Sequence, residues 1–385
     1  MQTASLLGLR GNALHGVWGN APESPRQIRG CPPADQESLT CREAFFYLIL
    51  IRITVRKRER MDFINETLED VTATGKTIPW KYMKIGSQMV AKALQATGHK
   101  KIARRVYKCA DELEYRKSLE NWNMTLINAR FCGLSLCPIC QRRLAIKRYY
   151  DLKRVVKQID QQEEVAEYIL MTLTVRNVTG EELRATVDGL LKSFTRFKKW
   201  KCIAENFVGF YRTLEISYNN VNDTYHPHLH IMFLVKPGYF DQANKSYLTT
   251  EKLVQEWKKC LGVDYTPVCD LRKIKGEKGV LEVVKYVNKT SDVLKLPEEI
   301  RQKVIHYLYV SLYRKRLVAF GGRMKEVAKE LKIELEEMKA EQKSDREENE
   351  LHNLNLTGIK KDFKTGEIYA IEKYFWNRKD YLFDE

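Results

Sequence analysis

The sequence has 385 residues and a formal net charge of +16 at pH 7, because 66 lysines and arginines outnumber 50 acidic residues. A cationic surplus of this size favours a polyanionic partner, nucleic acid first and an acidic membrane surface second, although a generally basic soluble protein has the same composition. The longest apolar run, AFFYLILI at 44–51, is too short for a membrane span and is followed at once by basic residues. We therefore expect two or three domains and no membrane-spanning helix.

The first sixty residues differ in composition from the rest. They are rich in Gly, Pro and Asn and show no helical or strand period, so residues 1–60 are predicted to be disordered, or an extension that precedes the true start at Met61. The nine cysteines are odd in number, and no secretory signal precedes them. This pattern indicates reduced thiols in an intracellular, cytoplasmic protein, where a tight cysteine cluster more often binds a metal than forms disulfides.

Residues 61–160 are expected to form a helical, basic region that binds zinc. The segment FCGLSLCPICQRR supplies three cysteines and a fourth lies upstream, giving the candidate ligands Cys109, Cys132, Cys137 and Cys140. Two thiolates at C-x-x-C spacing can hold one tetrahedral zinc ion, and the other two would complete a structural site. His99 is the alternative fourth ligand. Buried structural thiols and a redox pair are the other interpretations, and no thioredoxin-like pattern supports the redox pair.

A basic amphipathic helix is predicted directly after the cysteines. In QRRLAIKRYYDLKRVVKQI, at 141–159, the apolar residues recur on one stripe and the basic residues lie largely outside it. The zinc site would anchor this helix, so its cations are candidate DNA contacts. These cations are Arg142, Arg143, Lys147 and Arg148.

Residues 161–320 predict an α+β domain. Strand patterns occur at 168–175, 211–218, 228–235 and 266–274, and helical patterns at 180–200, 251–262 and 281–289. The order of these elements is typical of a ferredoxin-like antiparallel sheet covered by helices on one face. Residues 321–385 are expected to form a helical C-terminal region, in which a Glu/Lys-rich helix leads through a polar linker to a docked aromatic tail.

Three of the seven histidines open one apolar strand, in TYHPHLHIMFLV at 224–235. Alternate residues of a strand share a face, so His228 and His230 point the same way and can hold one metal ion. A hairpin turn in the preceding NNVNDT segment would place Glu215 opposite His228 and supply a third ligand. Two imidazoles and one carboxylate suit a divalent ion that polarises a substrate oxygen. The alternative is a hairpin whose histidines only form hydrogen bonds near the surface.

A further candidate site lies in LEVVKYVNKTSD. Glu282 and Tyr286 are four residues apart, which places them on one face of a helix, and Lys285 and Lys289 flank them as candidate phosphate contacts. A tyrosine near a divalent metal can attack a phosphodiester, and a nearby carboxylate can later activate the group that resolves the adduct. Taken alone, the same pattern is more typical of an ordinary exposed helix face.

These motifs together resemble the replication initiators of small rolling-circle plasmids from Gram-positive bacteria, in the HUH endonuclease superfamily. The segments FCGLSLCPICQRR, LMTLTVRN, YRTLEISYN followed by YHPHLHIMFLV, and LEVVKYVNKTSD occur in the family's order. The resemblance extends from about residue 75 to the C-terminal YFWNRKDYLF, and the first sixty residues match nothing in the family.

The resemblance implies a role for each matched residue. His228 and His230 would bind Mg²⁺ or Mn²⁺ with Glu215 as a third ligand, while His226 fits the motif without a defined role. Tyr286 would be the nucleophile that nicks DNA and becomes joined to its 5′ end. Glu282 would be the general base that ends a round of replication.

The function implied is origin-specific nicking of a hairpin-forming plasmid origin, which frees a 3′-OH to prime the host DNA polymerase. No P-loop motif is visible, so a host helicase is expected to open the duplex. The sequence leaves open whether the protein forms a homodimer. Two alternatives stand beside this function: another HUH enzyme, such as a mobilisation relaxase or transposase, and a zinc-containing DNA-binding regulator without catalysis.

Overall fold

The computed structural model describes residues 67–68, 70, 76–162, 166–240, 247–274, 280, 283–284, 290–333, 358–362 and 368–384. All of them belong to one compact unit, Asn65–Glu385. The expectations for residues 1–60 lie outside this part of the chain. The same holds for Glu282, Lys285, Tyr286 and Lys289.

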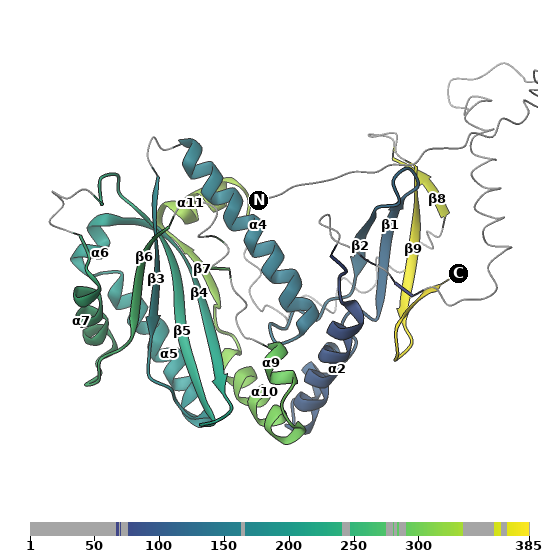
Figure 1. Cartoon of the computed structure of the whole chain (residues 1–385), viewed down its shortest axis with the longest axis horizontal. Helices are drawn as coiled ribbons and strands as arrows, with labels where there is room; N and C mark the ends of the chain where they lie inside the picture. The colour runs from purple at the N-terminus through teal and green to yellow at the C-terminus, as the bar shows by residue number, and fades with distance from the viewer. Residues whose placement is uncertain are drawn as a thin grey trace, which may run out of the picture. The chain divides into compact units, whose positions relative to one another are not determined.

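The central sheet has five antiparallel strands in the order β6-β3-β5-β4-β7 (Figure 1). Its strands are β3 (Glu167–Thr174), β4 (Phe207–Asn219), β5 (Thr224–Val235), β6 (Cys269–Ile274) and β7 (Val318–Gly321). The first four confirm the predicted strands to within a few residues. Strand β7 was not predicted, because a run of four residues is too short to reveal a period of two.

One face of the central sheet is covered by helices that follow the strands in sequence. Leu229, Ile231 and Phe233 of β5 are buried there, and the ring centroids of Phe194 and Phe233 lie 6.5 Å apart. Phe194 belongs to the covering helix α5, which begins with a capping box between Thr179 and the third helical residue. This layer consists of α5 (Gly180–Phe197), α6 (Lys201–Asn206), α7 (Thr250–Leu261) and α10 (Glu298–Leu312).

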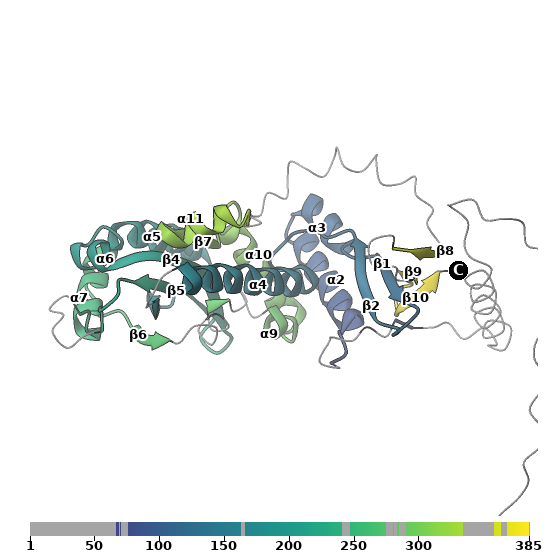
Figure 2. The same cartoon turned by 90° about the horizontal axis from the view of Figure 1, so that it is seen from above.

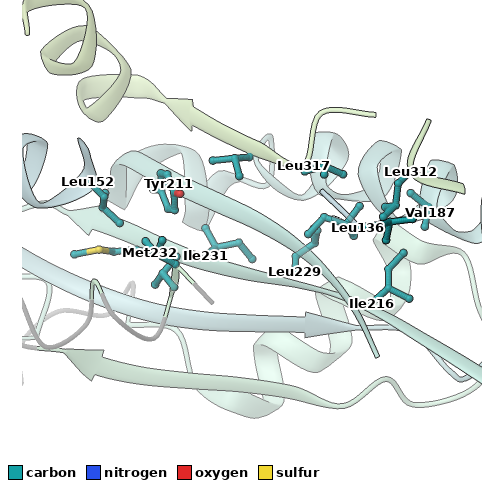
Figure 3. Packing of buried hydrophobic residues seen from close by; sticks show 14 of the residues in the cluster. Leu136, Leu152, Val187, Tyr211, Ile216, Leu229, Ile231, Met232, Leu312 and Leu317 are labelled. Atoms are coloured by element: carbon teal, nitrogen blue, oxygen red, sulfur yellow. The ribbon is translucent and has the colours of Figure 1, made fainter. Parts of the chain in front are cut away.

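The opposite face of the sheet is also covered in part, which corrects the prediction of helices on one face only. Figure 3 shows Leu152 beside Tyr211 and Met232, and Leu152 belongs to α4 (Pro138–Gln162). Helix α11 (Gly322–Glu330) in turn contacts both α4 and β4. The long basic helix was predicted correctly, but its apolar stripe alone could not reveal that it packs on this sheet.

A second antiparallel sheet combines the two ends of the described chain in the order β10-β9-β1-β2, with β8 paired to β9. Its strands are β1 (Glu112–Ser118), β2 (Met124–Ala129), β8 (Gly358–Lys361), β9 (Ile368–Trp376) and β10 (Tyr381–Asp384). The predictions of helical structure throughout 61–160 and of a helical C-terminal region are therefore wrong for these strands. Leu113 and Tyr115 alternate with partly exposed polar residues, but this short period is hidden in a basic, helix-like composition.

The aromatic tail is docked, as predicted, and helix α2 (Trp80–Ala96) packs near it. The buried carboxylate of Asp70 accepts hydrogen bonds of 2.8 Å from the Trp80 indole and from the Tyr115 hydroxyl. Tyr381 is fully buried and donates to the carbonyl of Ala110 at 2.6 Å. Helix α3 (Lys100–Tyr107) follows α2, and α9 (Thr290–Leu294) contacts α2 as well. Among the helices in the described segments, none has the length and apolar character of a transmembrane helix.

Candidate metal centres

The four predicted cysteines converge in one buried cluster. Cys109 follows α3 and Cys132 follows β2, while Cys137 and Cys140 lie at the start of α4, so that three separate segments meet here. Their sulfur atoms all lie within 4.8 Å of one another, and each cysteine is at least 96% buried. The fourth member of the cluster is thus Cys109, and His99 is not part of it.

The geometry of the cluster fits a tetrahedral metal. The Sγ atom of Cys140 lies 3.6 Å from that of Cys109 and 3.5 Å from that of Cys132. Zn–S bonds of about 2.3 Å in a tetrahedron separate the sulfurs by about 3.8 Å, which is close to these values. Burial raises the pKa of the Cys137 thiol well above its ordinary value, so a cluster of thiolates requires a compensating cation.

The cysteine sulfurs also accept backbone hydrogen bonds. The amide of Gly133 donates to the Cys140 sulfur at 3.2 Å, and the amide of Cys132 donates to the Cys109 sulfur at 3.4 Å. Such donors stabilise thiolate charge and fix the side-chain rotamers of the ligands. The four residues can therefore hold a structural Zn²⁺ ion.

The second cluster lies on the central sheet. Glu215 of β4 pairs directly with His228 of β5, which confirms the predicted hairpin register. The candidate ligand atoms of Glu215, His228 and His230 all lie within 4.8 Å of one another. The Glu215 carboxylate oxygen is 3.1 Å from His230 Nε2 and 3.6 Å from His228 Nε2. Both imidazoles thus direct Nε2 toward one carboxylate, as two ligands of a shared metal ion require.

Hydrogen bonds at the far side of each ring fix the two imidazoles. His228 Nδ1 lies 3.1 Å from the carbonyl of His226, which can only accept, so the ring donates from Nδ1 and turns Nε2 toward the Glu215 carboxylate. His230 Nδ1 lies 3.2 Å from the hydroxyl of Thr172 on β3. Outer contacts of this kind orient histidine ligands in metal sites.

The electrostatics of the site keep Glu215 ionised. Burial raises the pKa of the Glu215 carboxyl, but the hydrogen bonds and positive charge of His228 and His230 outweigh burial and lower the pKa to about 2. A carboxylate that is 93% buried and charged at neutral pH can hold a divalent cation. Two imidazoles and one carboxylate leave coordination positions open for a substrate oxygen.

His226 lies outside this three-residue group. Its ring stacks on that of His228 with 5.1 Å between centroids, and burial together with the neighbouring His228 lowers the pKa of His226. A neutral ring in this position supports His228 sterically. The structure thus places His226 beside the candidate ligands rather than among them.

Two threonines opposite His230 complete the face and were missed by the sequence analysis. Thr172 and Thr213 pair with His230 from the two flanking strands. The hydroxyl of Thr213 donates to the carbonyl of Val283 at 3.0 Å, so the backbone at Val283 is held on this face of the sheet. The signal was available in principle, because strand register places both threonines beside His230, but β-sheet threonines are too common to be noticed.

The four basic residues predicted on α4 are partly exposed along that helix. Arg143 lies over the ring of Phe131 with 4.9 Å between its guanidinium carbon and the centroid, and Lys147 forms a 2.9 Å ion pair with Asp151. Arg142 and Arg148 share the same helix. Four of the six predicted DNA contacts thus lie on the first three turns of α4, directly after the cysteine cluster.

Comparison with known proteins identifies the family. A family model described as replication protein matches residues 123–370. A protein rep of Streptococcus pneumoniae serotype 2 is 34% identical over 281 residues, which cover 71% of this chain and 86% of that protein. A protein rep of Bacillus amyloliquefaciens is 33% identical over 69% of this chain and 86% of its own length, and one of Lactiplantibacillus plantarum is 29% identical over 83% and 99%. The chain belongs to this family of replication proteins, which confirms the resemblance to rolling-circle plasmid initiators. No solved structure matches the chain significantly.

Proposed function

We propose that the chain is a plasmid replication initiator that nicks one strand of its own origin through a covalent 5′-phosphotyrosine. The membership of the replication protein family supports the initiator role. In this proposal the central sheet is the ferredoxin-like core of an HUH nicking domain at 161–320. It is preceded by the zinc-binding region at 61–160 and followed by the C-terminal region at 321–385.

One observation carries the proposal. The buried group of Glu215, His228 and His230 lies on the sheet face where Thr213 holds the backbone of Val283, three residues before Tyr286. The backbone of Val283 is thus hydrogen-bonded to β4, the strand that also carries Glu215. A regulator that only binds DNA has no need of this arrangement.

The reaction exchanges one phosphodiester for another. The Tyr286 hydroxyl loses its proton as its oxygen attacks the scissile phosphorus, the bond from phosphorus to the 3′ oxygen breaks, and that oxygen takes up a proton. The 5′ end stays attached to Tyr286, and the free 3′-OH primes the host polymerase. Glu282 then serves as the general base for the group that resolves the adduct. Both transfers need positioning and electrostatic stabilisation rather than an external energy source.

The two metal centres have separate roles in this proposal. A Mg²⁺ or Mn²⁺ ion held by Glu215, His228 and His230 would polarise the scissile phosphate and stabilise its developing charge. A Zn²⁺ ion held by the four cysteines would brace the chain around α3 and α4. Proposed DNA contacts are Lys285, Lys289, Arg142, Arg143, Lys147 and Arg148. Origin DNA, a host helicase and a host polymerase are the proposed partners.

A denaturing gel tests this function. Purified protein is incubated with Mn²⁺ and labelled single-stranded oligonucleotides that tile the origin of its own replicon. We expect a covalent protein–DNA band with wild-type protein and no band with Tyr286→Phe, with His228→Ala/His230→Ala or after EDTA. Tyr82→Phe is the matched control, because Tyr82 is 75% exposed on α2 and lies in a different part of the fold.

Each outcome separates the alternatives. A band that persists in Tyr286→Phe would move the nucleophile to another tyrosine. DNA binding without any band, and indifferent to EDTA, would favour the non-catalytic regulator. A band that forms only with transfer-origin DNA would favour a mobilisation relaxase.

A further inference from the structure

Helices α2 and α3 form a closely packed pair that the proposed nicking chemistry does not use (Figure 2). Only Thr97, Gly98 and His99 connect them. The amide of His99 donates to the carbonyl of Leu94 at 2.8 Å, and that of Gly98 donates to Gln95 at 3.1 Å. This pair of bonds is a Schellman motif, and its glycine has φ +87°, which glycine adopts without strain.

Small apolar side chains allow the two helices to approach closely. Ala93 and Leu94 near the end of α2 are buried, as are Ala103 and Val106 of α3. Two helices joined by a three-residue turn that contains glycine have the connection that is typical of a helix-turn-helix. In DNA-binding proteins the second helix of such a pair enters the major groove.

The charge of this pair is uniform. Residues 76–110 contain nine lysines and arginines and no acidic residue. The exposed side of α3 and of the residue after it presents four cations and one aromatic ring: Lys100, Lys101, Arg104, Tyr107 and Lys108. Cations four apart on a helix repel one another, and an eight-residue helix is not stable alone, so the surface is maintained by its surroundings.

Three contacts hold α3 in place. The fully buried ammonium of Lys84 on α2 donates to the carbonyls of Tyr107 and Cys109, at 2.9 Å and 2.7 Å, and so caps the end of α3. Arg105 donates to the carbonyl of Cys132 at 2.9 Å, which links α3 to the cysteine cluster. These contacts come from the inner side of α3 and leave its exposed cations to face solvent.

The turn before α3 is fixed as well. His99 Nε2 lies 3.0 Å from His306 Nδ1 on α10, and the ring of His99 contacts that of Tyr309 at 4.6 Å between centroids. Helix α10 also packs on α5 of the central domain. The position of α3 is thus tied to the domain that carries the Glu215 cluster.

We propose that α2 and α3 form a helix-turn-helix element whose second helix, α3, binds double-stranded DNA. The ligand is the sugar-phosphate backbone of a duplex, contacted by Lys101, Arg104 and Lys108, with Tyr107 directed at the groove. This inference deepens the proposed function, on which it rests for its origin DNA. In this proposal α3 binds the duplex, and the sheet face that carries Glu215 acts on the single strand.

The test measures duplex binding and single-strand nicking separately. The triple variant Lys101→Ala/Arg104→Ala/Lys108→Ala is compared with Lys192→Ala/Lys199→Ala/Lys252→Ala, which removes the same charge from exposed lysines of α5 and α7 and of the residues that follow α5. The probe is a labelled origin duplex of about 30 base pairs, roughly three helical turns, titrated at several salt concentrations. Circular dichroism and thermal melting show whether both variants are folded.

We expect the α3 variant to bind the duplex about tenfold or more weakly than the control at roughly 0.15 M salt, with its log–log salt slope smaller by about two to three. Its nicking of the single-stranded oligonucleotide should equal that of wild type. Equal duplex affinity and salt slope in the two variants would overturn the proposal, and so would loss of single-strand nicking in the folded α3 variant. A wild-type protein that fails to nick, while its duplex binding still depends on α3, would refute the proposed function and leave this inference standing.

Discussion

Replacing Lys84 by methionine should loosen α3 and the loop that follows it. Lys84 is fully buried, and its ammonium donates to the carbonyls of Tyr107 and Cys109 and to the carboxylate of Asp111. Methionine keeps the apolar stem of the side chain but supplies no donor. Asp111 is 47% exposed and can be rehydrated, so loss of its ion pair with Lys84 contributes little to the destabilisation.

The cost therefore arises mainly from the two carbonyls. A buried acceptor left without a partner costs about 1–3 kcal/mol, which applies in full to the buried contact at Cys109 and in part to the part-buried one at Tyr107, and the avoided burial of an ammonium offsets some of this cost. We expect a net loss of about 2 kcal/mol in the local stability of α3, equivalent to roughly 30-fold. Hydrogen exchange measured by mass spectrometry should show this acceleration in peptides that cover residues 100–110.

The control is Lys81→Met, one turn earlier on α2. Lys81 is 47% exposed and pairs with Asp380 at 2.8 Å, so its replacement should cost less than about 1 kcal/mol and leave exchange in α3 unchanged. Wild-type protection of residues 100–110 in Lys84→Met would refute the reasoning, because the two carbonyls would then have found other donors. Equal acceleration of hydrogen exchange in both variants would show that removing any lysine charge from α2 loosens α3.

Three further changes test the metal centres and the sheet face. Thr213→Val removes the hydroxyl that donates to the carbonyl of Val283. We expect the nicking rate to fall up to about tenfold, while the affinity for Mn²⁺, measured by calorimetry, stays unchanged. A nicking rate equal to that of wild type would show that this hydrogen bond does not position the nicking residues. The pKa of Glu215 is lowered to about 2 from 4.5, so its charge stabilises the fold above pH 4.5 and this contribution of about 3 kcal/mol is lost as the pH falls toward 2. With EDTA present, Glu215→Gln should therefore show a flatter decline of unfolding free energy between pH 4.5 and 2, and a decline as steep as in wild type would contradict the assignment. Cys137→Ser should release zinc, measured with a chromogenic chelator, and lower the melting temperature, whereas Cys260→Ser, outside the cluster, should change neither.

The central sheet could be predicted because its signals are local. Strands β4 and β5 are long, alternate clearly and are joined by a short turn, so simple hairpin counting was sufficient to place Glu215 opposite His228. The cysteine cluster was predictable for a different reason. Thiolates at C-x-x-C spacing have few structural uses, and Cys109 was the nearest remaining donor in a chain with reduced thiols.

The second sheet could not be predicted in the same way. Leu113 pairs with Tyr374, more than 250 residues later, and no local pattern specifies such a partner. The proposed helix-turn-helix element was also missed, since 61–160 was treated as one helical region and Gly98 was not recognised as a turn. Thr213 needed the register of β4 as well as the position of Val283, and only the three-dimensional structure supplies both.

The pairing of β1 with β9 has a consequence for how the protein is made. During synthesis β1 emerges from the ribosome long before β9, so its edge opposite β2 stays unpaired until the final residues have been translated. Tyr381, which is buried against Ala110, is translated later still. The sheet beside the cysteine cluster and α3 is therefore completed only after β9 and β10 have been translated. A product that terminates before β9 would expose the open edge of β1 to proteases and to other chains.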